Sequence, residues 1–236
     1  MKKKIVLMLT VIMLIGLAGC GKNQINIKET GTSDNNEQMV QNIYENKRTE
    51  VKQKISEIKE RLPETSAEDK GTCGSKAKWY YKDNTLIIYG EGVITEDTWH
   101  KSNIVINTVV IDSGITKLGN NMFSGLGSEV GKNIENFYIA DGLEEIGSST
   151  FVNCDCLSEI VLPPSLYFID GYTFASCDSL KNVYMTDGVE KIGDSAFTGC
   201  KSLDSIFIPK TVLAIGNGVF TLSLIHISEP TRPISI

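Results

Sequence analysis

The feature that most constrains the fold is a 23-residue period in the second half of the chain. Five columns of similar residues recur in one register: Ile146, Ile169, Ile192 and Ile215; Phe151, Phe174, Phe197 and Phe220; Cys154, Cys177 and Cys200; Leu157, Leu180 and Leu203; and Ile160, Val183 and Ile206. Five columns in one register predict a solenoid, because each unit then forms one coil and equivalent side chains stack from coil to coil.

The residues between the columns indicate how one coil is built. Ile160 and Leu162 alternate with Val161, which is the period-two pattern of a short strand with one buried face. Pairs such as Asp187-Gly188 then turn the chain. An earlier and divergent copy begins at Leu118 and carries five extra residues before Ile134, which we expect to form a surface loop. We therefore expect a mainly β solenoid whose repeats span residues 112–220.

Two further units are predicted between the amino terminus and the repeats. Within residues 37–62, Val51, Ile55, Ile58 and Leu62 follow helical spacing and Pro63 ends the pattern, which predicts an amphipathic spacer helix. Two heptads are few for a coiled coil, so packing on the next domain is favoured over oligomerisation. Residues 71–111 predict a β capping module, with a hairpin around the turn Lys82-Asp83-Asn84.

The first residues predict export and lipid anchoring. Lys2, Lys3 and Lys4 precede an apolar run that is too short for a membrane span, so residues 1–19 are interpreted as a signal peptide. The four residues 17–20, Leu-Ala-Gly-Cys, resemble a bacterial lipobox, which implies lipidation of Cys20. The alternative is an ordinary signal peptide with a cysteine near its cleavage site. Residues 20–36 then form a lipidated, flexible tether.

Charge limits the class of partner. The formal net charge is −6, and removal of the leader with its three lysines changes it to −9. Nucleic-acid binding requires basic patches, so we expect no nucleic-acid partner. An anionic surface also favours a monomer.

The repeat motif resembles a known family. The pattern Ile-Gly-x-x-x-Phe-x-x-Cys-x-x-Leu-x-x-Ile, seen from Ile192 to Ile206, resembles the BspA-like class of leucine-rich repeats. Gly71-Thr72-Cys73-Gly74 and the run from Leu86 to Gly90 also resemble the capping module that often precedes such repeats. The resemblance implies a bacterial surface or secreted protein that takes part in adhesion.

The carboxyl-terminal residues 221–236 depart from the repeat. The string from Leu222 to Arg232 resembles a translated sequencing adapter, which predicts a non-native tail and a longer natural protein. The alternative is a natural cap, since terminal repeats are often atypical.

The cysteines predict structure rather than chemistry. Cys154, Cys177 and Cys200 share one interior column, which favours a ladder of small buried thiols, and a disulfide between neighbouring coils is the alternative. Cys156 is expected on the solvent side. The Cys154-Asp155-Cys156 run has no nearby histidine and no second ligand pair, so no metal site is predicted.

No catalytic set is predicted from the sequence. The two histidines are His100, in the capping module, and His226, in the suspect tail, and neither completes a nucleophile, base and acid arrangement. No cofactor and no catalytic residue are therefore expected.

One column predicts a ligand-binding surface. The strand positions that point away from the core hold Tyr138, Val161, Tyr184 and Phe207, preceded by Val110, and we name these five residues the apolar stripe. Exposed aromatic side chains in a row suit a protein or glycan ligand. The alternative is that they are good strand formers that stack on one another.

These observations predict a lipid-anchored, extracytoplasmic and non-enzymatic solenoid that binds an extracellular protein or glycan. A carbohydrate-active enzyme on a β-solenoid is one alternative, but recurrent acidic residues in a groove are missing. A structural spacer for a carboxyl-terminal domain that is missing from the sequence is the other.

Overall fold

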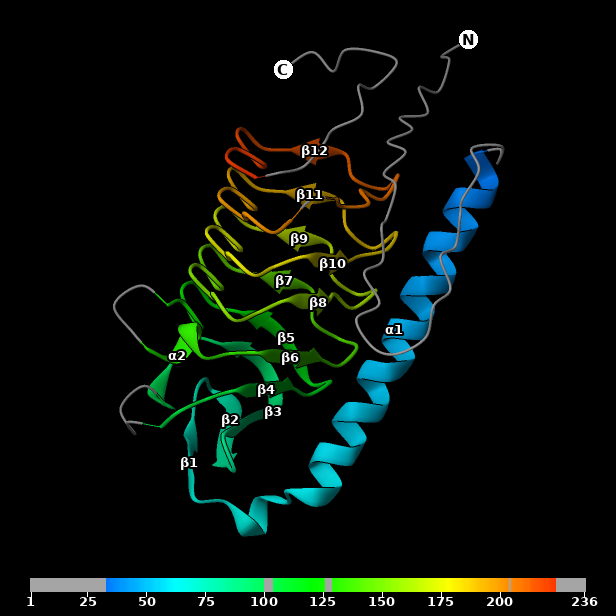
Figure 1. Ribbon diagram of the computed structural model, residues 1–236. Coiled ribbons are helices and arrows are strands. Elements are labelled where there is room, and N and C mark those ends of the chain that lie inside the picture. Colours follow the sequence, from blue (N-terminus) through cyan, green and yellow to red (C-terminus); the bar gives the residue numbers. More distant parts are fainter. Residues whose placement is uncertain (1–32, 100–103, 126–128, 204, 224–236) are drawn as a thin grey trace, which may run out of the picture.

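The computed structural model describes residues 33–99, 104–125, 129–203 and 205–223. Its elements begin with the long helix α1, pass through a β hairpin, and end in a regular stack of short strands (Figure 1). In chain order they are α1 (Ser33–Arg61), η1 (Glu64–Ser66), β1 (Asp69–Thr72), β2 (Lys76–Lys82), β3 (Thr85–Ile94), β4 (Thr108–Ile111), β5 (Ile115–Leu118), α2 (Glu129–Lys132), β6 (Asn136–Ile139), β7 (Glu145–Ile146), β8 (Glu159–Val161), β9 (Phe168–Ile169), β10 (Asn182–Tyr184), β11 (Lys191–Ile192) and β12 (Ala214–Ile215).

The predicted hairpin is confirmed as β2 and β3, which pair antiparallel from Lys82↔Thr85 outward. Both residues of the connecting turn, Asp83 and Asn84, have a positive φ, of 47° and 55°. A two-residue turn of this kind matches the natural twist of paired strands, and Asp and Asn tolerate the left-handed conformation. β1 adds a third antiparallel strand to β2.

The long strand β3 connects this cap to the solenoid, because it pairs in parallel with both β4 and β5. From β5 one ladder continues through β7, β9, β11 and β12, which we name the β5–β12 face. From β4 a second ladder continues to β6, and β8 pairs with β10 farther along, which we name the β4–β10 face. The fold is thus a mainly β solenoid with coils of about 23 residues, as predicted, and it has about five turns. The short helix α2 lies within the predicted insertion.

The phenylalanine column forms a continuous stack in the core. The rings of Phe151, Phe174 and Phe197 are fully buried, and neighbouring ring centroids lie 5.0 and 5.2 Å apart with nearly parallel planes. Trp99 extends the stack into the cap, with its centroid 5.4 Å from that of Phe123. Cap and repeats therefore share one hydrophobic core.

The cysteine column is buried as predicted, and its members are free thiols. Each thiol donates to the backbone carbonyl of a phenylalanine in the preceding coil: Cys177 to Phe151, at 3.0 Å, is one example. Ser223 occupies the next position of this column, and its hydroxyl donates to the Phe197 carbonyl at 2.7 Å. The repeat register therefore extends through Ser223, past the expected boundary at residue 220.

Gly147, Gly193 and Gly216 stand at equivalent positions of three coils. A positive φ is not the reason for glycine there, because the positive φ falls two residues later, for example at Ser149 and Ser195. At Gly193, an added Cβ would lie 2.5 Å from the backbone nitrogen of Gly171. Close approach between neighbouring coils is what excludes a side chain there.

Candidate functional site: the helix-covered face

The apolar stripe forms on the β4–β10 face as the sequence predicts. Val110 pairs with Tyr138 across β4 and β6, and Val161 pairs with Tyr184 across β8 and β10. Phe207 lies in the corresponding segment of the last coil, outside any strand. The repeat register therefore brings these residues into one row.

The expectation that this stripe is exposed to solvent is wrong for three of its five residues. Val110, Val161 and Tyr184 are buried, with exposed fractions of 0%, 4% and 8%. The reason is helix α1, which runs along this face of the solenoid (Figure 1). Tyr138 and Phe207 keep partial exposure at this face.

Helix α1 lies antiparallel to the direction in which the coils stack. Near its carboxyl end, Leu62 accepts a hydrogen bond from Tyr80 of the cap, at 2.9 Å. Toward its amino end, Gln41 accepts a hydrogen bond from Thr186, after β10, at 3.1 Å. The helix therefore spans the solenoid from the cap to the coil that contains β10.

Apolar residues of α1 form a second hydrophobic cluster with the stripe. The helix and the residue that follows it contribute Tyr44, Val51, Ile55, Ile58 and Leu62, all of which are buried. The other buried members are Tyr80, Ile87, Val110, Val161 and Tyr184. The packing of the predicted spacer helix on the next domain is thus a property of the structure, and it removes most of the stripe from water.

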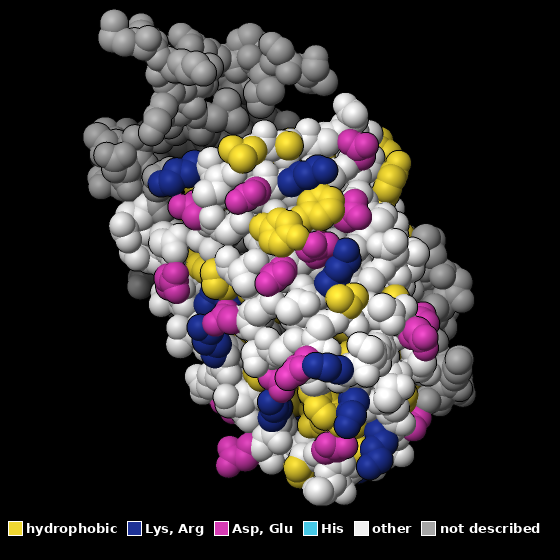
Figure 2. All heavy atoms as spheres, turned by 180° about the vertical axis from the view of Figure 1, so that it is seen from behind, with side chains coloured by type: hydrophobic (Ala, Val, Ile, Leu, Met, Phe, Trp, Pro, Cys, Tyr) yellow, Lys and Arg dark blue, Asp and Glu magenta, His cyan; other side chains and the backbone are white. Residues whose placement is uncertain are grey.

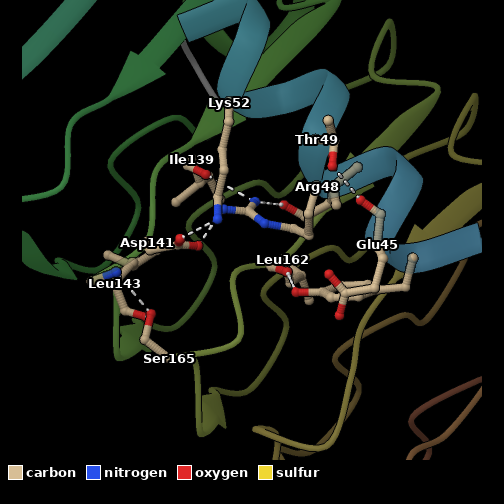
Figure 3. A network of polar contacts seen from close by, with 12 residues as sticks. Glu45, Arg48, Thr49, Lys52, Ile139, Asp141, Leu143, Leu162 and Ser165 are labelled. Atoms are coloured by element: carbon tan, nitrogen blue, oxygen red, sulfur yellow. Dashed lines mark hydrogen bonds and ion pairs between the residues drawn. The ribbon is translucent and has the colours of Figure 1, made fainter. Parts of the chain in front are cut away.

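A polar network fixes the helix in its place (Figure 3). Arg48, with a side chain 3% exposed, forms an ion pair with Asp141 at 2.7 Å and donates to the carbonyl of Ile139 at 3.0 Å. Tyr44 donates to the carbonyl of Leu162 at 2.9 Å. Arg48 also lies 3.4 Å from the carbonyl of Val161. These carbonyls lie at or just after the ends of β6 and β8. Helix α1 buries them, and its own side chains supply the hydrogen-bond donors that they would otherwise lack.

The charges of this network are consistent with a persistent contact. Burial raises the pKa of Asp141, but hydrogen bonds and charge from Lys52 and Arg48 outweigh burial, so its pKa lies below the ordinary value. Burial raises the pKa of Tyr44, which keeps the hydroxyl protonated as a donor. Lys47 adds an ion pair with Glu159 at 3.1 Å and lies over the ring of Tyr184.

Two partly or fully exposed aromatic residues on the β5–β12 face, Tyr167 and Phe168, were missed by the sequence analysis. Lys117, Glu145, Phe168, Lys191 and Ala214 form one row of strand partners across it. Figure 2 shows an apolar patch among Lys, Arg, Asp and Glu side chains on the face seen from behind. The sequence contains a signal that could have identified them: when the coils are aligned with the 23-residue period, Tyr167 and Phe168 occupy positions that hold charged residues in the neighbouring coils.

Other predicted site residues lie elsewhere. Cys20, His100 and His226 lie outside the described residues, so the lipidation site stays a prediction. Cys156 is exposed, as expected. Within the described ranges, no group of three or more His, Cys, Asp or Glu side chains is placed to hold a metal ion. In those same ranges, none of the helices has the length and apolar character needed to cross a bilayer.

The coils, the shared core and the parallel ladders define the class of the protein: it is a leucine-rich-repeat solenoid. More particularly, residues 129–235 match the family described as the BspA type leucine rich repeat region, in six copies. A search of curated proteins finds no significant relative.

Three solved structures resemble this chain in fold. The leucine rich repeat protein of T. pallidum shares 21% identity with a TM-score of 0.49, over 69% of this chain and 68% of that one. The pneumococcal vaccine antigen PcpA shares 18% identity with a TM-score of 0.46, over 66% of this chain and 48% of that one. A leucine rich cell surface protein of Faecalibacterium prausnitzii shares 21% identity with a TM-score of 0.44, over 71% and 57%. The chain thus spans about half to two thirds of these proteins.

Proposed function

We propose that this protein is a lipid-anchored, extracytoplasmic binding module that takes part in adhesion and catalyses no reaction. Cys20 carries the lipid, the residues between Cys20 and the start of α1 at Ser33 form the tether, and the solenoid presents its surface to an extracellular protein or glycan. Two or more acyl chains hold a protein stably on a bilayer.

The observation that carries this proposal is the fixation of α1 on the repeats. The tether would lead directly into α1, and α1 is bound to the solenoid through Arg48 and Asp141 and through ten shared apolar residues. A pull on the lipid anchor is therefore transmitted to the whole stack of coils rather than to one loop. That arrangement suits a protein that must hold a ligand while attached to a membrane.

The position of the ligand follows from the same contact. Tyr138 and Phe207 stay partly accessible, whereas Val161 and Tyr184 are covered by α1. We therefore propose that a ligand of the native protein uses Tyr138 and Phe207 only as marginal contacts, and that the main binding surface lies away from α1.

The experiment is expression of the full chain in a bacterium fed an alkyne fatty acid, followed by labelling and fractionation. We expect label on the protein and recovery in the membrane fraction, both lost in Cys20→Ala. Cells that display the wild-type chain are then tested for adhesion to immobilised fibronectin, mucin and neutral oligosaccharides. Absence of label, or adhesion equal to that of cells without the chain on every surface, contradicts the proposal.

A further inference from the structure

One coil differs from its neighbours on the β5–β12 face at two consecutive positions. Tyr167 and Phe168 stand where the preceding coil has Glu144 and Glu145 and the following coil has Glu190 and Lys191. We name Tyr167 and Phe168 the aromatic pair. The backbone follows the same ladder in all three coils, so the fold accepts charged side chains here and does not require rings.

The aromatic pair lies on the surface. Ile169 points into the core and is fully buried, so the alternation along β9 directs Phe168 outward, where it is partly exposed. Tyr167 is 40% exposed. Helix α1 packs on the other face of the solenoid, so it does not cover the pair. Large aromatic side chains left partly in water indicate a binding surface.

Charged neighbours hold the two rings in place. The Tyr167 hydroxyl donates to the Glu145 carboxylate, which also forms an ion pair with Lys117 at 2.6 Å. The ammonium group of Lys191 lies 4.9 Å from the centre of the Phe168 ring. The pair is therefore ordered before any ligand arrives, which lowers the entropic cost of binding.

We propose that the aromatic pair is a carbohydrate-binding platform that takes a neutral oligosaccharide. The apolar C–H face of a sugar ring matches one aromatic ring in size and stacks on it. The hydroxyl groups around that sugar face donate to Glu144, Glu145 or Glu190 and accept from Lys191. This inference rests on the proposed function and names its site and its class of ligand.

The size and the charge of the platform favour a glycan over a protein. A stable protein interface covers about 800 Å² on each partner and has a core depleted of charged residues. Here the platform offers two rings, and charged residues stand at the equivalent positions of both neighbouring coils. The local charges include both signs, and Lys117 is paired with Glu145, so the platform lacks the one-signed field that selects a charged polymer.

The test uses the full chain, purified in detergent, on a printed array of neutral and sialylated oligosaccharides and on immobilised fibronectin and mucin. Maltohexaose, cellohexaose, laminarihexaose and mannohexaose are then titrated in solution by calorimetry. The variants are the double variant Tyr167→Ser with Phe168→Ser, and a control, Val105→Ser, which removes an exposed apolar side chain outside the platform. Circular dichroism and thermal unfolding show whether each variant folds.

We expect wild type and Val105→Ser to bind at least one neutral oligosaccharide, and the double variant to bind it at least tenfold more weakly while it stays folded. If the double variant fails to fold, Lys191→Met and Glu190→Gln take its place, with a loss of threefold or more expected from each.

Three results overturn the inference: no neutral oligosaccharide binds, sugar binding is unchanged in the variants, or the variants lose binding to fibronectin alone. Adhesion of displaying cells that persists in the double variant overturns this site and leaves the proposed function standing. If cells that display the wild-type chain do not adhere, the proposed function itself is contradicted.

Discussion

Arg48 of α1 and Asp141, 93 residues farther along the chain, form an ion pair of 2.7 Å at the ends of two strands of the solenoid. Lys52 binds the other carboxylate oxygen of Asp141, also at 2.7 Å. The two cations share one partner but differ in environment, since the Arg48 side chain is 3% exposed and that of Lys52 is 60% exposed. Asp141 therefore has one buried contact, with Arg48, and one surface contact, with Lys52.

The first prediction compares these two cations. Arg48→Met leaves the carbonyls of Ile139 and Val161 and the Asp141 carboxylate without their donor, so we expect the free energy of unfolding to fall by about 2 kcal/mol. The value stays below that of a fully buried pair because Asp141 is half exposed and Arg48 Nε has no partner among the described residues. Lys52→Met, the matched control, should cost less than about 0.5 kcal/mol. Urea unfolding checks both, and equal losses would contradict the account.

The second prediction concerns acid. The pKa of Asp141 is lower in the folded protein than in the unfolded chain, so its contribution to stability is present above about pH 4 and is lost as the pH falls through the folded-state pKa. We expect the unfolding free energy of wild type to fall more steeply below about pH 4 than that of Asp141→Asn. Urea unfolding at a series of pH values measures how the unfolding free energy of each protein depends on pH. Parallel curves for wild type and Asp141→Asn would show that the ion pair adds nothing to stability.

The third prediction concerns the phenylalanine stack. Phe174 is fully buried between Phe151 and Phe197, so Phe174→Ala should lower the free energy of unfolding by about 3 to 5 kcal/mol through lost contacts and a cavity. Phe220 is only partly buried, and among the described residues it stacks on Phe197 alone, with centroids 5.8 Å apart. Phe220→Ala should therefore cost about half as much or less. Thermal and urea unfolding compare them, and a larger loss at Phe220 would refute the stacking order.

The fourth prediction concerns the thiols. Burial raises the pKa of the Cys73, Cys177 and Cys200 thiols, and Cys154 is buried as well, so all four side chains lie out of reach of a reagent in solvent. Cys156 is exposed. A disulfide reagent applied to the native protein at about pH 8 should modify Cys156 alone among these five, and mass spectrometry of peptides identifies the site. Cys156→Ser should abolish the fast reaction, whereas a bridged or rapidly labelled column cysteine would count against the ladder.

The repeats could be predicted from sequence because each coil repeats the same requirement. A buried column such as Phe151, Phe174 and Phe197 must keep its size from coil to coil, and that constraint is visible as a period. The hairpin was equally accessible, since Asp83 and Asn84 suit a tight turn and flank runs of strand-forming residues.

The burial of the apolar stripe beneath helix α1 could not be predicted in the same way, because it depends on a contact between segments that lie about 100 residues apart in the sequence. The helical spacing of Val51, Ile55 and Ile58 shows that α1 has an apolar face, but it does not say which surface receives that face. Upstream of Val51, Tyr44 and Arg48 occupy heptad positions and interrupt the run of apolar residues. In the structure both are buried and bind strand carbonyls, so the interruption is itself part of the docking contact.

The aromatic pair was missed for a related reason. A search for repeats finds positions that keep the same type of residue in every coil. Tyr167 and Phe168 are informative because they differ from the residues at the equivalent positions of the neighbouring coils. A departure of this kind has meaning only once the structure shows that the position is exposed and that neighbouring coils hold charges there.

The most direct test of the account is hydrogen–deuterium exchange of the intact wild-type protein, read on peptides that cover residues 44–62. Most of the stability of a helix in a protein comes from the packing of its apolar face, so strong protection of these amides requires docking on the solenoid. We expect protection comparable to that of β6 and β8 in wild type, and a selective loss of protection on α1 in Arg48→Met. Exchange on α1 at the rate of an unstructured peptide, with β6 and β8 still protected, would contradict the account, because the apolar stripe would then be open to a ligand.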